Sequence, residues 1–307
     1  AYCSVAASSA HGRYRQRSVE SVLDEIRAHL DRYDVGFIDF EDENLTLDKK
    51  WFTALFEGIL PMITGRDIEF RAMNGLFPPS IDDEIVALMK EIGFKTLNLS
   101  LGSTSSEQLA RFRRKDVRAS FESALKLAKA HGLTSVSYVI GAAPGQSAAD
   151  SLTDLIYLAQ MPTLAGFSVY YPAPGSLDFE TCRSKGLLPE KFTLMRSTAL
   201  PVEDTTSRLE AVTLLRLSRI INFLKSLVDA GEQFPEPEAF TSRMVAPDLG
   251  RQNISRKLLQ WLMHDARIRG ITPDGTVFEH AVSPELTWEF VRQIRRAKIR
   301  GVTRSMP

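Results

Sequence analysis

The sequence predicts an α/β fold with a parallel sheet, followed by a mainly helical segment. Short apolar runs begin near residues 35, 68, 96, 135 and 166, and their spacing of about thirty to forty residues is the length of a βαβ unit. Amphipathic stretches with apolar residues at helical spacing lie between these runs. Strands that alternate with helices in this way form parallel sheets with right-handed crossovers.

The composition is that of a globular protein with a substantial core. Apolar residues make up 44% and charged residues 25% of the 307-residue chain. Lysine plus arginine equals aspartate plus glutamate, at 38 each, so no global field recruits nucleic acid or an anionic membrane. No apolar run is long enough to predict a membrane span. The two cysteines cannot form a disulfide framework, and we therefore expect a cytoplasmic protein.

The first helix and the first strand are predicted from their apolar patterns. Apolar residues recur at helical spacing between Ser18 and about Tyr33, and Ser18 is a suitable N-cap. The run 35–40 predicts a buried strand. It ends in three acids and an amide at 41–44, and a second helix follows around Trp51.

The same alternation continues to about residue 171. It predicts four further strands, at 68–72, 96–101, 135–140 and 166–171, and helices at 82–91, 118–130 and 148–159. Because a helix precedes the first visible strand, we expect another strand just before Cys3. That makes six strands, of which the first lies outside the chain.

The pattern changes after Ser176. Long helices are predicted at 205–228, 254–267 and 284–300, with a hairpin at 270–278 built on an Asp-Gly turn. We therefore divide the chain into residues 1–190, an α/β part, and residues 191–307, a mainly helical extension.

Polar or glycine-rich residues follow most of the predicted strands. In α/β barrels and doubly wound sheets, ligands bind beyond the carboxyl ends of the strands. Ordinary βα loops and helix N-caps are the competing interpretation. The loop 141–145 fits neither the Walker nor the dinucleotide pattern. The acids at 41–43 could hold an ammonium group, or could simply favour the start of a helix.

Several other side chains have both a functional and a structural interpretation. One of the basic residues at 111–115 could pair with a carboxylate, or all could lie on a solvated turn. The five histidines show no metal-ligand spacing, and Cys182 is most simply a buried apolar residue. The basic residues at 292–304 could contact phosphates, although a charged outer helix face is the simpler interpretation.

Five segments in a fixed order resemble a known family. Tyr2-Cys3-Ser4 resembles the end of a Cys-x3-Cys-x-aromatic-Cys signature. Four segments at the later strand ends are also similar to those of the family: 38–46, 99–104 with 111–115, 139–146 and 170–175. Together they resemble radical S-adenosylmethionine enzymes, particularly the branch in which a cobalamin-binding domain often precedes the barrel. The resemblance covers residues 1–190 and implies a partial (β/α)6 TIM-like barrel that lacks its first strand.

The resemblance implies a role for each matching residue. Cys3 is the last thiolate ligand of a 4Fe–4S cluster, and Tyr2 lies beside the adenine of S-adenosylmethionine. One residue of the segment Asp42, Glu43 and Asn44 contacts the methionine ammonium, and the resemblance does not indicate which one. The remaining implied cofactor-binding residues, for the ribose, the carboxylate and the adenine end, are Ser100, Thr104, Arg114, Gly141 and Tyr170.

Two features depart from the family pattern. Gly-Gly-Glu is replaced by Asp42-Glu43-Asn44, a variant associated with the cobalamin-linked branch. Two cluster cysteines are absent, so we expect a chain truncated inside the cysteine motif and inactive alone.

The resemblance implies an enzyme that cleaves S-adenosylmethionine reductively to produce a 5′-deoxyadenosyl radical. A reducing electron donor of the flavodoxin or ferredoxin type is a further implication, and the resemblance is compatible with cobalamin bound by a preceding domain. Substrate and reaction stay open, with methyl transfer, sulfur insertion and rearrangement all compatible. Two alternatives remain: a cluster-free α/β-barrel lyase or aldolase that uses the acids at 41–43, and a non-catalytic degenerate barrel that binds RNA or protein.

Overall fold

The fold is described from a computed structural model of the chain. It describes residues 15–194, 200–246 and 249–303, and the predicted site residues Tyr2 and Cys3 lie outside them. Two compact units make up the chain, and their boundary lies between Tyr138 and Val139, inside a strand. We call the described residues before this boundary unit 1 and those after it unit 2. The predicted division after residue 190, between an α/β part and a mainly helical part, stays a prediction.

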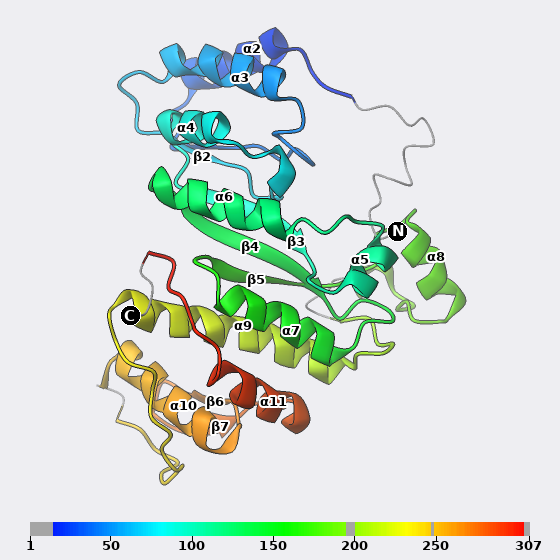
Figure 1. The fold of residues 1–307 in the computed structure, drawn as a ribbon, viewed down its shortest axis with the longest axis vertical. Helices are drawn as coiled ribbons and strands as arrows, with labels where there is room; N and C mark the ends of the chain where they lie inside the picture. Colours follow the sequence, from blue (N-terminus) through cyan, green and yellow to red (C-terminus); the bar gives the residue numbers. More distant parts are fainter. Residues whose placement is uncertain (1–14, 195–199, 247–248, 304–307) are drawn as a thin grey trace. The chain divides into compact units, whose positions relative to one another are not determined.

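Unit 1 alternates helices and strands in the predicted order (Figure 1). Its elements are α2 (Val19–Arg32), β1 (Phe37–Asp39), α3 (Lys49–Ile59), η1 (Leu60–Met62), β2 (Glu69–Arg71), η2 (Pro78–Ser80), α4 (Asp83–Ile92), β3 (Thr96–Gly102), α5 (Ser106–Phe112), α6 (Arg118–Ala130) and the first part of β4 (Thr134–Gly141). The positions of the predicted strands and helices of this region are confirmed to within about two residues, the usual uncertainty of element ends. The prediction that the first strand is buried is wrong, because Phe37 on β1 is 54% exposed.

The strands of unit 1 are connected by parallel pairing. β1 pairs in parallel with β2, with Asp39 opposite Arg71. Isolated parallel bridges join Phe70 to Phe94 and Leu76 to Leu99, and β3 then neighbours β4. The carboxyl ends of these strands consequently lie on one edge.

An aromatic cluster fills the space between α3 and the strands of unit 1. Phe52 and Phe56 on α3 lie with ring centroids 4.4 Å apart, and Phe56 also contacts Phe40, Phe70 and Phe94. Phe52, Phe56, Phe70 and Phe94 are almost fully buried. Such tilted pairs add roughly 0.5–1.5 kcal/mol each beyond the burial of their surface.

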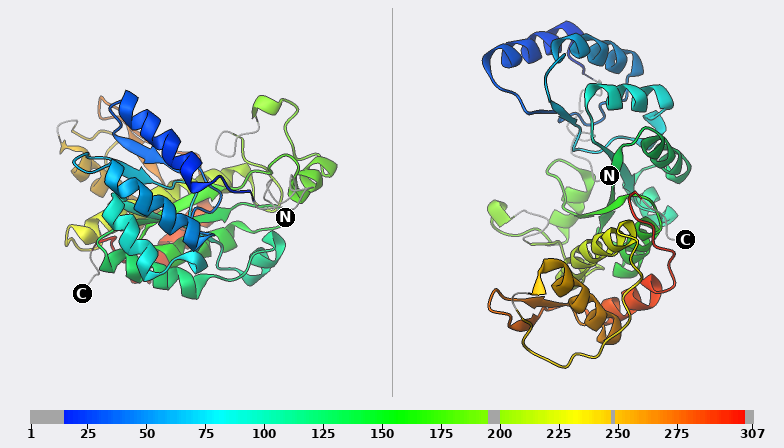
Figure 2. Two further views of the ribbon diagram at one scale, coloured as in Figure 1. Left: turned by 90° about the horizontal axis from the view of Figure 1, so that it is seen from above. Right: turned by 90° about the vertical axis from the view of Figure 1, so that its left-hand side faces the viewer.

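Unit 2 is mainly helical. It contains the end of β4, then α7 (Ala148–Ala159), β5 (Leu164–Val169), α8 (Leu177–Ser184), η3 (Phe192–Leu194), α9 (Arg208–Asp229), α10 (Arg251–Asp265), β6 (Arg269–Ile271), β7 (Val277–Glu279) and α11 (Pro284–Ile294). α9 packs against β5 and α7, and α11 packs against α7, α9 and α10. Figure 2 shows the orange α10 and the red α11 side by side.

The predicted hairpin is confirmed, whereas the last helix is shorter than predicted. β6 and β7 pair antiparallel, and Gly275 in the turn has φ +89°. The prediction extended the last helix to residue 300, but α11 ends at Ile294. Beyond the helix, Ile299 is buried and the Arg300 amide donates to the carbonyl of Ala159, so the chain leaves the helix to make these contacts. No helix in the described ranges is long and apolar enough to cross a membrane.

Candidate functional site

The acidic segment after β1 lies at the strand-end edge of unit 1. The side-chain amide of Asn74 donates to the Glu41 carbonyl at 2.9 Å, and Thr46 donates to the side-chain oxygen of Asn44. Asp42 and Glu43 are exposed, and neither carboxylate forms an ion pair with a described residue. Nearby protein atoms displace water from the Asp42 carboxyl and raise its pKa. The backbone of the segment is therefore fixed while two carboxylates remain available.

Ser100 and Arg114 are brought together at the end of β3. The Arg114 guanidinium donates to the Ser100 hydroxyl at 3.2 Å and approaches its carbonyl at 3.4 Å. The backbone of Arg114 is anchored at the end of α5, where its amide donates to Leu109. Gly102, with φ +84°, leaves room for the guanidinium, because an added Cβ would lie 3.0 Å from Nη1. Thr104 is half-buried between β3 and α5.

A row of side chains one layer beneath Ser100 was missed by the sequence analysis. Tyr138 on β4 donates to Asn98 on β3 at 3.2 Å, and the Asn98 amide contacts the Met73 sulfur at 3.8 Å. The Met73 backbone amide in turn approaches Asp39. Burial raises the pKa of Tyr138. The signal was present, since Asn98 and Ser100 alternate with leucines in β3, and polar residues are rare in the middle of a buried parallel strand.

In unit 2, the loop after β4 is held by contacts from the chain itself. The Gly145 amide donates to Asp204 at 3.0 Å, and the Ala142 amide donates to the Ser151 hydroxyl. The carbonyl of Gln146 accepts from Thr205 and Thr206 at 2.7 Å each. The described structure therefore uses several of the loop's backbone groups for internal packing.

Gly141, a predicted cofactor-binding residue, has a packing role. An added Cβ would lie 2.3 Å from the Phe167 ring, a distance that real Cβ atoms do not adopt. The Gly141 carbonyl accepts from the Tyr170 amide at 2.8 Å. The absence of a side chain here is thus explained by the neighbouring strand, and cofactor contact at Gly141 stays a prediction.

Tyr170, just after β5, lies close to α8, which carries Asp178 and the buried Cys182. The Tyr170 hydroxyl donates to Asp178 at 3.2 Å, and the residue is 2% exposed. Burial raises the pKa of the Tyr170 hydroxyl and raises that of the Cys182 thiol to about 11. Cys182 is therefore a buried core residue, as the sequence analysis expected, and its raised pKa disfavours the thiolate form.

The described residues fit one part of the implied cofactor set. Arg114 and the free carboxylates of Asp42 and Glu43 are suited to the carboxylate and ammonium of an amino-acid group, and they lie on the same strand-end edge of unit 1. A cluster fits less well, because the 307 residues contain two cysteines and Cys182 is protonated. No group of three histidine, cysteine, aspartate or glutamate side chains in the described ranges could hold a metal ion.

These features define an α/β protein whose strand ends carry polar groups suited to the carboxylate and the ammonium of an amino acid. Residues 1–155 match the model of the Radical SAM superfamily, which is 155 of 307 residues and therefore just over half. The chain belongs to this superfamily, and membership implies S-adenosylmethionine and a 4Fe–4S cluster as cofactors.

Two curated proteins are related to the chain over part of its length. It is 24% identical over 177 residues to the anaerobic magnesium-protoporphyrin IX monomethyl ester cyclase of Cereibacter sphaeroides. It is 26% identical over 179 residues to the protein of that name from Rubrivivax gelatinosus. Each alignment covers 56% of this chain, but 28% and 31% of those proteins. The chain thus spans less than a third of the length of these relatives.

Two solved structures show a distant likeness. The radical S-adenosylmethionine methyltransferase TsrM from Kitasatospora setae, with cobalamin and a [4Fe-4S] cluster bound, has a TM-score of 0.49 at 15% identity, over 59% of this chain and 34% of that one. Coproporphyrinogen III oxidase (HemN) from Escherichia coli has a TM-score of 0.48 at 15% identity, over 74% and 49%. Because both TM-scores are below 0.5, neither likeness defines the fold of this chain.

Proposed function

We propose that the chain forms the S-adenosylmethionine-binding part of a radical S-adenosylmethionine enzyme. The family match over residues 1–155 carries this proposal. When bound, the 4Fe–4S cluster and the cofactor supply the electron and a 5′-deoxyadenosyl radical for the reaction with substrate. The chain's own residues bind and orient the cofactor's amino-acid end.

Arg114 is the residue that we assign to the carboxylate of the cofactor. Its guanidinium is already oriented by Ser100 and by the space above Gly102, so little side-chain freedom is lost when a carboxylate binds. Asp42 or Glu43 would accept hydrogen bonds from the ammonium. Loss of a proton from Asp42 prepares it for this contact, and because its pKa is raised, binding should weaken as the solution becomes acidic.

Binding of S-adenosylmethionine to the chain tests this assignment without any turnover. Isothermal titration should show that Arg114→Ala loses about tenfold or more in affinity, as expected for a hydrogen bond to a charged group. Arg111→Ala is the matched control, since Arg111 is exposed and pairs only with Glu107 among the described residues. Equal affinities for the two variants would refute the role of Arg114.

Anaerobic reconstitution tests the proposed reaction. A version extended upstream by a Cys-x3-Cys pair should take up an oxygen-sensitive cluster and release 5′-deoxyadenosine from the cofactor. The 307-residue chain should not, because one thiolate replaces three. Activity in air, unchanged by Cys3→Ala, would instead support the cluster-free lyase.

Four finer features belong to the same proposal. We propose a six-strand partial barrel, supported by the parallel order of the strands in unit 1. Cobalamin is proposed from the variant Asp42-Glu43-Asn44 segment. A flavodoxin- or ferredoxin-type donor follows from the need for one low-potential electron. A cytoplasmic location is proposed from the sparse use of cysteine.

A further inference from the structure

The exposed side of α11 carries a tryptophan followed by a run of cations. Trp288, Arg292 and Arg295 lie at i, i+4 and i+7, which is one stripe of a helix, and all three are exposed. The run continues past the helix end with three further exposed cations, Arg296, Lys298 and Arg300. Residues 292–300 contain no acid. We call Trp288 and these five cations the α11 basic surface.

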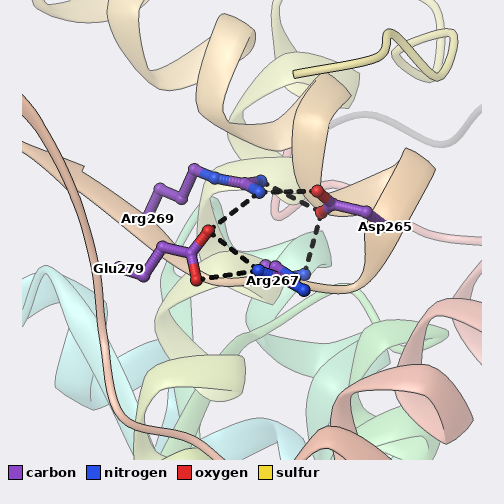
Figure 3. A network of polar contacts seen from close by, with 4 residues as sticks. All are labelled: Asp265, Arg267, Arg269 and Glu279. Carbon is purple, nitrogen blue, oxygen red and sulfur yellow. Dashed lines mark hydrogen bonds and ion pairs between the residues drawn. The ribbon is translucent and has the colours of Figure 1, made fainter. Parts of the chain in front are cut away.

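Four other cations of this region pair with carboxylates. Figure 3 shows Arg267 and Arg269 between Asp265 and Glu279, with Arg269 donating to Asp265 at 2.6 Å and to Glu279 at 3.2 Å. Arg256 pairs with Glu232, and Lys257 pairs with Glu238 at 3.0 Å. Each of these four cations thus has a carboxylate partner within the fold.

The α11 basic surface is compensated at one position. Arg292 pairs with Glu289 at 2.6 Å, and Arg295 donates to the carbonyl of Met263 at 3.0 Å. Within the described ranges, Arg296, Lys298 and Arg300 form no ion pair. Residues 249–303 contain ten lysines and arginines against five acids. Glu232 and Glu238, outside this range, pair with two of the ten cations, which leaves an excess of three positive charges in a chain whose total is zero. The positive charge is therefore concentrated here.

The exposed ring of Trp288 indicates which class of partner suits the α11 basic surface. Its side chain is about half exposed, at 50%, whereas the other large apolar residues of α11 are buried, namely Leu286, Phe290, Val291 and Ile294. A helix that lies in a membrane needs a broad apolar face, and one tryptophan does not provide it. A single exposed aromatic ring beside phosphate-binding cations matches the stacking platforms that bind unpaired bases.

We propose that the α11 basic surface binds single-stranded nucleic acid. The cations contact the phosphates, and Trp288 stacks on a base. This inference goes beyond the proposed function and depends on neither cofactor, so it can fail or succeed independently of radical chemistry. An acidic protein is the other partner class that the charge would suit, and the experiment separates the two.

Fluorescence anisotropy of the full chain with a labelled, short single-stranded RNA tests the proposal. Affinity should fall linearly with salt on logarithmic axes, with a slope of about −0.7 for each phosphate neutralised. The double variant Arg296→Glu with Lys298→Glu should lose at least about tenfold in affinity. The matched control is Lys126→Glu with Lys129→Glu, two exposed lysines on α6, which should leave binding unchanged. Equal losses in both double variants would overturn the proposal.

A second set of variants tests the stacking contact. Trp288→Ala should weaken RNA binding by about tenfold, and Trp288→Phe should retain most of it, because stacking depends on an aromatic face. Polyglutamate and phosphatidylserine vesicles serve as competing anionic partners. Absence of RNA binding at low salt would overturn the proposal. It would also be overturned by equal or tighter binding of polyglutamate or the vesicles, or by RNA binding that does not change in Trp288→Ala.

Discussion

The ammonium of Lys225 donates a hydrogen bond to the carbonyl of Arg300, 75 residues further along the chain, at 2.8 Å. It also donates to the carbonyls of Ala159 and Met161, at 3.0 and 2.6 Å. Lys225 is fully buried on α9, so its three N–H groups find three acceptors inside the protein. One turn later, Asp229 accepts from the backbone amides of Val302 and Thr303. Two side chains of one helix thus fasten the segment 300–303.

Replacing Lys225 with methionine should destabilise the protein. The carbonyls of Ala159 and Met161 keep other donors, from Arg300 and Thr163, so the main loss is the hydrogen bond to Arg300. A buried polar group without its partner costs about 1–3 kcal/mol, and we expect a decrease of that size in the free energy of unfolding by urea. Lys126→Met, on the exposed side of α6, should change stability by about 0.5 kcal/mol or less.

The same lysine should make stability depend on pH. Burial lowers the pKa of Lys225 from 10.5 to about 7, although its three carbonyl acceptors oppose the shift. Between these values the unfolded chain holds a proton that the folded chain releases. Stability should therefore rise with pH across this window, by up to about 1.4 kcal/mol per pH unit. Subtracting the profile of Lys225→Met isolates this contribution, and identical slopes for the two proteins would contradict it.

Gly141→Ala should be strongly destabilising. The new Cβ would lie 2.3 Å from the Phe167 ring, so strand or ring must move, at a cost of about 1–3 kcal/mol as for other overpacked cores. Phe167→Leu should relieve the clash, and the double variant should therefore be more stable than the sum of the single changes predicts. Gly175→Ala is a control in open space, where only the φ of +84° opposes the substitution. Additive effects of the changes at 141 and 167 would exclude the clash.

Substituting Arg269 should cost far more stability than substituting Arg267, although both side chains contact Glu279. The side chain of Arg269 is 2% exposed and that of Arg267 is 63% exposed. Arg269→Met leaves Asp265 without its main partner, and breaking a buried ion pair costs about 3–5 kcal/mol. Arg267→Met should cost about 1 kcal/mol or less. Thermal and urea unfolding of the two variants compare them directly, and equal costs would show that burial does not determine this network's strength.

Acid should weaken the same network. Burial alone would raise the pKa of Asp265, but hydrogen bonds from the Arg269 side chain and the Arg267 backbone hold it below its ordinary value. A carboxyl with a lowered folded pKa contributes stability above its unfolded pKa and loses it as the pH falls through the folded value. The wild-type protein should therefore lose more stability than Asp265→Asn on acidification. A parallel decline would contradict this assignment.

The order of strands and helices was predictable because local periodicity determines it. Ser18 caps the first helix and the apolar run 96–101 forms β3, both as expected from the sequence. Short α5 and α8 were not separated from loops, since seven or eight residues give little periodicity. The early end of α11 depends on the burial of Ile299 and on Ala159, a contact that no local pattern contains.

The candidate site was predictable by position more than by contact. The strand-end rule selected the acids at 41–43, and the family resemblance selected Ser100 and Arg114. The hydrogen bond between Ser100 and Arg114 depends on how the chain turns after α5. Lys225 has the helical spacing of a core residue and the chemistry of a surface one. It can be buried because carbonyls far away in the sequence accept its hydrogen bonds, and such contacts cannot be predicted from periodicity.

The close approach of Gly141 and Phe167 has a consequence for the history of this family. Two positions on different strands that share one small volume cannot vary independently. Homologous sequences with a side chain at the position of Gly141 should carry a smaller residue at that of Phe167, and those that keep the phenylalanine should keep the glycine. An alignment in which the two positions change freely would show that backbone adjustment, rather than paired substitution, has accommodated the change.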